Sequence, residues 1–135
     1  MTMKVRRVAM AVVALAIAGA PAVHAEGDKV MPVRSEKLPN VPGKSLTAVV
    51  VNYAPGGKSA SHHHAGSVLA YVLSGSIRSE NSATGPARVY KAGESFFEPP
   101  GSRHLVSENA SEKERATLLA VHVADDGEHL TTFDK

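Results

Sequence analysis

Turn-forming residues divide the chain from Ser45 onward into short apolar segments, and this spacing limits the fold more than any other feature. The turn signals are clusters of proline, glycine, serine and asparagine: Pro55-Gly56-Gly57, Ser74-Gly75, Ala92-Gly93, Pro99-Pro100-Gly101 and Asn109-Ala110-Ser111. Between them lie about seven or eight segments of strand length, which is typical of an antiparallel sandwich or barrel. No stretch after residue 25 keeps a helical periodicity over the roughly 11 residues that identify a helix. We therefore predict a single all-β domain.

The first 25 residues are typical of a secretory signal peptide. Lys4, Arg6 and Arg7 form a basic start, residues 8–20 are apolar, and small residues then lead to a cleavage position after Ala25. The apolar run is shorter than the roughly 20 residues that a transmembrane helix needs, although an uncleaved anchor is the alternative. We expect a periplasmic or secreted protein that has no membrane contact after cleavage.

Removal of this leader would change both the length and the charge of the chain. The whole sequence has 15 basic and 13 acidic residues, a net charge of +2. The 110 residues that remain have 12 basic and 13 acidic residues, a net charge of −1. Such a balance predicts no nucleic-acid partner. The absence of cysteine excludes disulfides, thiol catalysis and cysteine metal sites.

Residues 26–44 are polar and contain Pro32, Pro39 and Pro42. We expect an extended N-terminal segment here rather than a packed element, and place the domain itself at residues 45–135. In a homodimer, which we expect, this segment could cross to the neighbouring subunit as an extra strand, because an unpaired edge strand is a liability.

Two histidines one residue apart, His62 and His64, follow a glycine pair and precede an apolar strand. Successive side chains of a strand point to opposite faces, so these two share a face while His63 points away. A third histidine, His104, follows Gly101 in a distant strand. Three imidazoles brought together would form a site for one divalent first-row metal ion, such as Fe, Mn, Ni, Cu or Zn. The alternative is that they are exposed strand and loop residues.

Two segments around these histidines resemble the two conserved motifs of the cupin superfamily. The first is Gly56-x5-His62-x-His64 with Tyr71-Val72-Leu73-Ser74-Gly75, and the second is Gly93-x5-Pro99-x-Gly101-x2-His104, with Asn109 slightly late. With their strands they cover roughly residues 45–124. The resemblance implies a single-domain jelly-roll β-barrel with one divalent metal in its interior. It also implies that the three histidines are ligands, together with a glutamate of the first motif.

That glutamate is missing, because Val68 stands at its position. In cupin barrels the strand with the glutamate runs beside the strand that ends at the second-motif proline, and Glu98 directly precedes Pro99. An inward Glu98 would supply a replacement carboxylate, and a buried carboxylate needs a cation. The predicted metal ligands are therefore His62, His64, Glu98 and His104.

The orientation of Glu98 remains open at this point. If Glu98 points inward, Phe96 does too; otherwise Phe97 does, and Glu98 faces solvent or an arginine. Glu98 and His122 are the candidates for acid–base catalysis. For His122, within the apolar run of residues 118–123, we favour a hydrogen-bonded or outward-facing side chain over a catalytic one.

A centre of histidines and one carboxylate leaves coordination positions open, which lets Fe(II) bind a substrate and O₂ together. Family analogy thus predicts a small-molecule enzyme of dioxygenase-like type. Mn, Ni or Zn would favour isomerase, decarboxylase or lyase chemistry instead. A non-catalytic sensor or storage module and a metal-free barrel are further alternatives. The fold alone cannot choose among them, because cupins have many functions.

Overall fold

The computed structural model describes residues 29–135, so the predicted signal peptide and its cleavage position lie outside the described residues. Within this part of the chain all regular secondary structure is β-strand. Consequently these residues offer no apolar helix of the length that would span a membrane.

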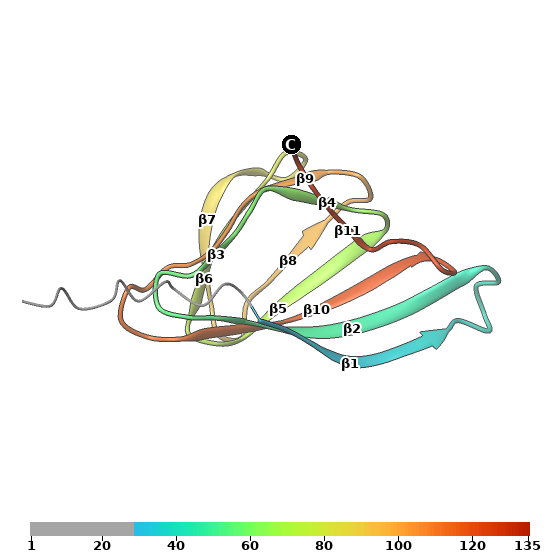
Figure 1. Cartoon of the computed structure of the whole chain (residues 1–135), viewed down its shortest axis with the longest axis horizontal. Helices are drawn as coiled ribbons and strands as arrows, with labels where there is room; N and C mark the ends of the chain where they lie inside the picture. Colours follow the sequence, from blue (N-terminus) through green and yellow to red (C-terminus); the bar gives the residue numbers. More distant parts are fainter. Residues whose placement is uncertain (1–28) are drawn as a thin grey trace, which may run out of the picture.

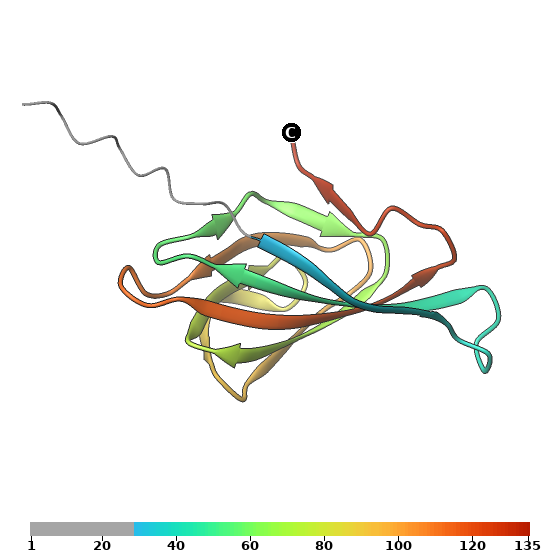
Figure 2. The same ribbon diagram turned by 60° about the horizontal axis from the view of Figure 1, so that its bottom comes forward.

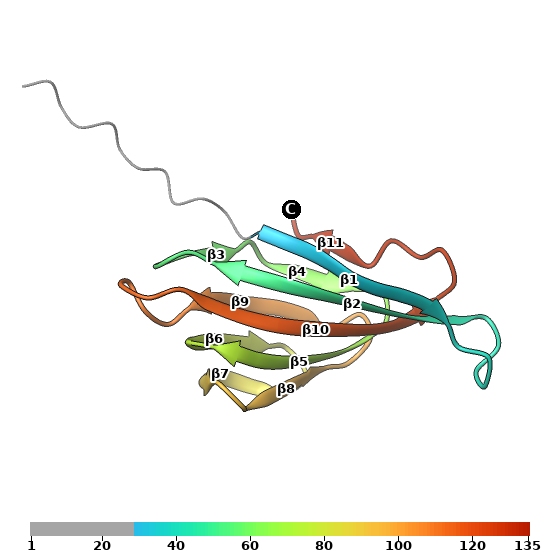
Figure 3. The same ribbon diagram turned by 90° about the horizontal axis from the view of Figure 1, so that it is seen from below.

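One antiparallel sheet, sheet A, has the strand order β1-β2-β10-β5-β8. Its strands are β1 (Lys29–Lys37), β2 (Lys44–Tyr53), β10 (Ala116–Asp125), β5 (Ser67–Ser74) and β8 (Ser95–Glu98). The long central strands β2 and β10 pair over their whole length, from Tyr53 opposite Ala116 to Lys44 opposite Asp125. Figure 3 shows these strands as one layer in front of the second sheet.

The second antiparallel sheet, sheet B, has the order β11-β4-β9-β6-β7, and the short strand β3 also pairs with β9. Its strands are β3 (Lys58–Ser59), β4 (His62–His64), β6 (Ser76–Asn81), β7 (Gly85–Lys91), β9 (Arg103–Asn109) and β11 (Thr131–Phe133). The two sheets form facing layers without joining into a closed barrel (Figure 1). This arrangement confirms the predicted all-β jelly-roll fold.

The core lies between the two sheets and follows from the strict alternation of side chains along the strands. On β10 every second residue is buried, and on β5 the buried residues Val68, Ala70 and Val72 alternate with exposed ones. Tyr53, Ile77, Phe96 and Leu118 complete most of the buried cluster. Each large apolar side chain buried in this way contributes roughly 1.5–3 kcal/mol to stability.

Gly66 links the histidine strand β4 to β5 and lets the chain pass directly over β10. A Cβ at this position would lie 2.0 Å from the carbonyl oxygen of Val123, which is backbone and cannot move aside. The absence of a side chain at Gly66 therefore fixes how closely β4 and β5 approach β10.

The N-terminal segment is extended and pairs with β2 of its own chain, with Lys29 opposite Asn52 and Lys37 opposite Ser45. All nine residues of β1 are exposed. Figure 2 shows the hairpin of β1 and β2 extending beyond the rest of the sheet. Hydrogen bonds to one neighbour, rather than burial, hold this strand in place.

Candidate metal centre

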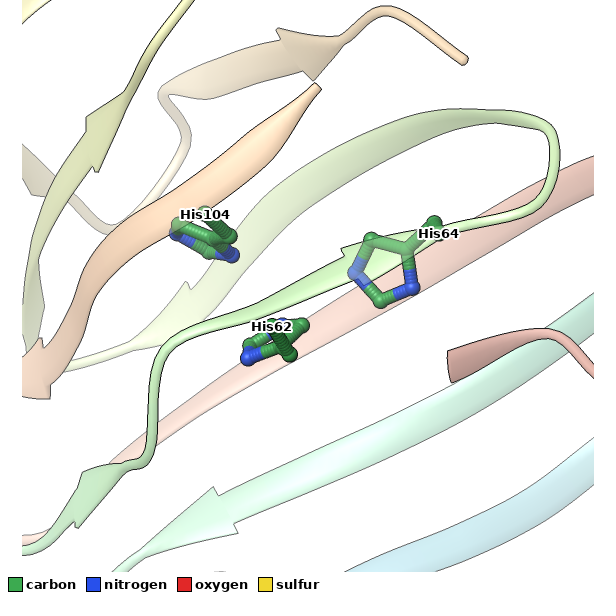
Figure 4. A group of neighbouring side chains, drawn as sticks. All are labelled: His62, His64 and His104. Carbon is green, nitrogen blue, oxygen red and sulfur yellow. The ribbon is translucent and has the colours of Figure 1, made fainter. Parts of the chain in front are cut away.

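Strand β4 consists of three histidines, and its alternation sorts them between the two faces of sheet B. His62 and His64 are each 7% exposed and leave the same side of the strand, toward the interior (Figure 4). His63 is half-buried on the other side, with Nδ1 3.3 Å from Oδ1 of Asp134. The period of two thus separates one histidine from the interior pair, as the sequence predicts.

His104 reaches the same place from β9, which pairs with β4 so that His104 stands directly opposite His62. The ring centroid of His62 lies 5.0 Å from that of His104 and 4.8 Å from that of His64. One nitrogen from each ring can be chosen so that all three lie within 4.8 Å of one another, a group that could hold a metal ion. Only 3% of His104 is exposed.

Hydrogen bonds on the outer side of the two β4 rings fix their orientation. Nδ1 of His62 lies 2.7 Å from the carbonyl oxygen of Ala60. Nδ1 of His64 lies 3.1 Å from both the carbonyl oxygen of Leu130 and Oγ1 of Thr131. A neutral imidazole that donates through Nδ1 keeps its lone pair on Nε2, which is the arrangement a metal-binding histidine requires.

Glu98 points inward, which settles the register that the sequence left open. Glu98 and Phe96 are 3% and 8% exposed, whereas Phe97 between them is 50% exposed. Oε1 of Glu98 lies 2.9 Å from Nδ1 of His104, and Oε2 lies 3.7 Å from Nε2 of His64. The carboxylate therefore contacts two of the three clustered imidazoles. Val68, where the cupin motif has its glutamate, pairs directly with Glu98 on the neighbouring strand.

The protonation states in this cluster suit metal ligands. Burial lowers the pKa of His64 from 6.5 to about 4, although the charge of Glu98 acts in the opposite direction. Burial also lowers the pKa of His62. Burial alone would raise the pKa of Glu98. The hydrogen bond from His104 and the charges of His104, His64 and His62 outweigh burial, so the pKa is lowered. At neutral pH His62 and His64 are thus neutral and Glu98 is ionised, as metal binding requires.

Two polar residues of β6 support the cluster and were not predicted from the sequence. Oγ of Ser79 lies 2.8 Å from Nε2 of His104. Nδ2 of Asn81 donates to Oγ of Ser102 at 3.0 Å and, at 3.5 Å, to Oε1 of Glu98. Side chains alternate along β6, which places Ile77, Ser79 and Asn81 together on its inner face. This alternation is the sequence signal that could have identified Ser79 and Asn81.

His122 departs from the interpretation favoured by the sequence, because its side chain is neither outward-facing nor fully hydrogen-bonded. It is 5% exposed, and its ring centroid lies 4.9 Å from that of His64. Its Nδ1 is buried and has no hydrogen-bond partner among the described residues. His122, Val68 and Glu98 stand opposite one another on the neighbouring strands β10, β5 and β8. This row on the inner face of sheet A therefore has an ionisable side chain on each side of the valine.

A cavity of about 50 Å³ adjoins the cluster. His64, Glu98 and His104 form its polar side, and the hydroxyl-bearing residues Tyr53 and Ser107 bond to each other at 2.6 Å beside it. The remaining lining is apolar: Val51, Ala70, Phe96, Leu118 and Ala120. At roughly 10–15 Å³ of such volume for each water, the cavity has room for only a small molecular fragment.

The donor set can be tested against a divalent metal from its own chemistry. Three buried imidazoles and one buried carboxylate are borderline nitrogen and oxygen donors, which suit Fe, Mn, Ni, Cu or Zn. In the described structure His104 uses both ring nitrogens, one toward Ser79 and one toward Glu98. It must give up one of these partners to bind a metal. If that partner is Glu98, the proton on Nδ1 of His104 must leave that nitrogen. With that exchange, the residues present fit the ion.

Comparisons with solved structures find the same architecture. An oxalate oxidase in complex with the substrate analogue glycolate aligns with a TM-score of 0.61 and 22% identity, over 79% of this chain and 55% of its own. A DMSP lyase from Ruegeria pomeroyi aligns with a TM-score of 0.56 and 22% identity, over 65% of this chain and 42% of its own. The chain thus spans about half the length of these two enzymes. At such identities the likeness shows the fold alone.

A cupin-like protein from Thermotoga maritima has a TM-score of 0.59 and 20% identity, over 79% of this chain and 75% of its own. No curated protein sequence matches the chain. The family model of the cupin domain, in contrast, matches residues 49–122, which are more than half of the 135 residues and include all three clustered histidines. By this match and by its two facing sheets, the chain belongs to the cupin domain family.

Proposed function

We propose that the protein binds one divalent transition metal inside the fold and uses it in dioxygenase-like chemistry on a small molecule. The proposed ligands are His62, His64, His104 and Glu98. The observation that carries this proposal is the buried carboxylate of Glu98, which lies 2.9 Å from His104 and 3.7 Å from His64. Removing a carboxylate from water costs several kcal/mol unless a cation compensates it.

The position of Glu98 answers the difficulty posed by Val68. Three neutral imidazoles alone would leave a divalent ion without a compensating negative charge. Since Glu98 stands opposite Val68 on the adjacent strand, its carboxylate reaches the histidines from the next strand of the same sheet. A carboxylate in the centre is thereby kept, although the residue that supplies it differs from that of the family motif.

The bound ion would supply Lewis-acid activation of a substrate oxygen and, if it is redox-active, an electron path to O₂. The chain supplies the surroundings. Apolar side chains such as Phe96 and Leu118 line the cavity, and an apolar lining strengthens electrostatic interactions beside it. Because this cavity has a volume of only about 50 Å³, the reacting part of the substrate must be small.

Proton-transfer chemistry of lyase, decarboxylase or isomerase type is the second candidate, and His122 favours it. The unpartnered Nδ1 of this buried ring can hold or release a proton beside His64. Structures of similar fold include both an oxidase of oxalate and a lyase of DMSP, so the fold supports either candidate. A binding module without catalysis would use the same ligands and show no turnover.

The proposal extends to the setting of the protein. The leader at residues 1–25 supports export to the periplasm or beyond, with cleavage after Ala25. We also propose a homodimer. The segment at residues 29–37 pairs with β2 of its own chain and forms the edge strand of sheet A.

Elemental analysis tests the metal centre directly. The untagged protein should carry about one transition-metal ion per chain, and the double variant His62→Ala/His64→Ala should carry none. Glu98→Gln keeps the shape of the side chain but removes its charge, and should weaken metal binding at least tenfold, because even residues that only support a ligand contribute roughly 10–100-fold. His129→Ala, at an exposed position, is the matched control and should retain the ion.

The identity of the ion then selects the activity assay. Iron together with substrate-dependent O₂ consumption would support the dioxygenase-like proposal, whereas turnover without O₂ would support the second candidate. A protein that carries no metal and takes up none of Fe, Mn, Ni, Cu or Zn would overturn the proposal. Unchanged metal affinity in Glu98→Gln would remove Glu98 from the ligand set.

A further inference from the structure

Asp134, directly after β11, bonds to three side chains on the outer face of sheet B. Its Oδ1 lies 3.3 Å from Nδ1 of His63. Its Oδ2 accepts a hydrogen bond from Oγ of Ser61 and another, at 3.2 Å, from Nε of Arg103. One carboxylate thus joins β9 to the start of β4 from outside, and we call these four side chains the Asp134 bridge.

The bridge lies directly behind the histidine cluster. Ser61 and His63 flank His62 in the sequence, and Arg103 directly precedes His104. Where β4 pairs with β9, His62 stands opposite His104, and the next pair is His63 with Arg103. Because successive side chains of a strand alternate between its faces, the first pair points into the interior (Figure 4) and the second points outward, to the carboxylate.

The backbone alone joins β4 and β9 over a short distance, because their ladder consists of two residue pairs. The outward pair adds no attraction of its own. Nε of Arg103 is a donor, and Nδ1 of His63 can also donate, but two N–H donors cannot bond to each other. They need an acceptor between them, and Asp134 supplies it.

Asp134 is better shielded from water than the two cations beside it. Its side chain is 15% exposed, against 40% for His63 and 57% for Arg103. The hydrogen bond from Ser61 is the main reason that the pKa of Asp134 lies below its ordinary value of 3.8. The carboxylate is therefore ionised at neutral pH, and hydrogen bonds to an ionised acceptor are roughly twice as strong as those between neutral groups.

We propose that Asp134 is a positioning residue of the metal centre, which holds the strands of His62 and His104 at the separation that a shared ion requires. This inference rests on the proposed function. A ligand set that is held in place before the ion arrives binds it more tightly, because less ordering accompanies binding. Asp134 acts on the ligands through their neighbours in the sequence.

Co²⁺ is the probe, because its visible absorption reports both its affinity and the arrangement of its ligands. Asp134→Ala should weaken Co²⁺ binding about tenfold, the lower end of the roughly 10–100-fold that residues bonded directly to a ligand contribute. It should also change the spectrum of the bound ion, which a loss of overall stability alone would not do.

The matched control is Asp126→Ala. Asp126 is also a carboxylate that accepts a hydrogen bond from a serine, Ser45, and pairs with a basic residue, Lys37. Its partners lie on β1 and β2, which carry none of the proposed ligands. This variant should therefore keep the Co²⁺ affinity and the spectrum of the parent protein.

Circular dichroism verifies that each variant is folded. If Asp134→Ala does not fold, Arg103→Ala, which removes one exposed arm of the bridge, is the second variant and should also weaken Co²⁺ binding. Unchanged affinity and spectrum in the folded variant, or an equal loss in Asp126→Ala, would overturn the proposal.

A parent protein that binds no ion would contradict the proposed function, and the bridge is then tested without metal. Amide hydrogen exchange of residues 61–64 in the metal-free protein measures how firmly β4 is held. Faster exchange in Asp134→Ala than in the parent protein would support the bridge. Unchanged exchange would overturn it.

Discussion

Acid should destabilise the metal-free protein well before its carboxylates are protonated. The pKa of His64 is about 4 in the folded chain, against an ordinary value of 6.5. Between these values the unfolded chain binds a proton at His64 and the folded chain does not, so lowering the pH favours unfolding. The stabilisation is complete above pH 6.5 and is lost as the pH falls toward 4. His62 and His122, whose pKa values burial also lowers, act in the same direction.

The size of the effect follows from the pKa shift of His64. Relative to neutral pH, this one residue should cost about 2 kcal/mol at pH 5 and about 3 kcal/mol at pH 4. That is a large part of the 5–15 kcal/mol by which a typical domain is stable. Glu98 contributes little above pH 5, where it is largely ionised in both states, but nearer pH 4 its lowered pKa adds to the loss of stability.

Urea unfolding of chelator-treated protein at pH 7.5, 6 and 5 measures the effect. His64→Gln should reduce the difference between pH 7.5 and pH 5 by about 2 kcal/mol. His129→Gln, which changes an exposed histidine, should leave it unchanged. Equal stability of the parent protein at pH 7.5 and 5, or an undiminished difference in His64→Gln, would show that His64 is not buried in its neutral form.

Two further substitutions test features of the interior. His122→Leu replaces a buried ring whose Nδ1 has no described partner, so it should stabilise the metal-free protein by about 1 kcal/mol in thermal unfolding; a clear loss would mean that this nitrogen is hydrogen-bonded in solution. Gly66→Ala would place a Cβ 2.0 Å from the carbonyl oxygen of Val123, so it should lower the free energy of unfolding by at least about 2 kcal/mol and should also weaken metal binding. The control is Gly127→Ala, whose Cβ meets open space. It should lower the free energy of unfolding only by the strain of its φ of 76°.

Much of the fold could be predicted because the signals were local. Turn residues bound most of the strands, and a period of two places His62 and His64 on one face. The inward position of Glu98 also follows from a local pattern, once Phe96 is known to be the buried member of the phenylalanine pair. The alternation itself did not reveal which of the two phenylalanines is inside.

The orientation of His122 could not be predicted, and the reason lies on β10. Leu118 and Ala120 face the core, but Leu119 and Val121 on the opposite face are apolar as well. A strand that is apolar on both faces has no polar side to set its phase. The support from β11 was also hidden, because Thr131 and Phe133 form a short strand whose partner, β4, is distant in sequence.

The pairing of β4 with β11 determines when the histidine centre can be completed during chain growth. Leu130 accepts the hydrogen bond of His64 across 66 positions of sequence, and the side chain of Asp134 bonds to that of Ser61 across 73. While a ribosome still holds residues 130–134, His64 has neither of the acceptors that fix its ring. The ring of His64 therefore acquires its fixed orientation only after the remainder of the domain has been released.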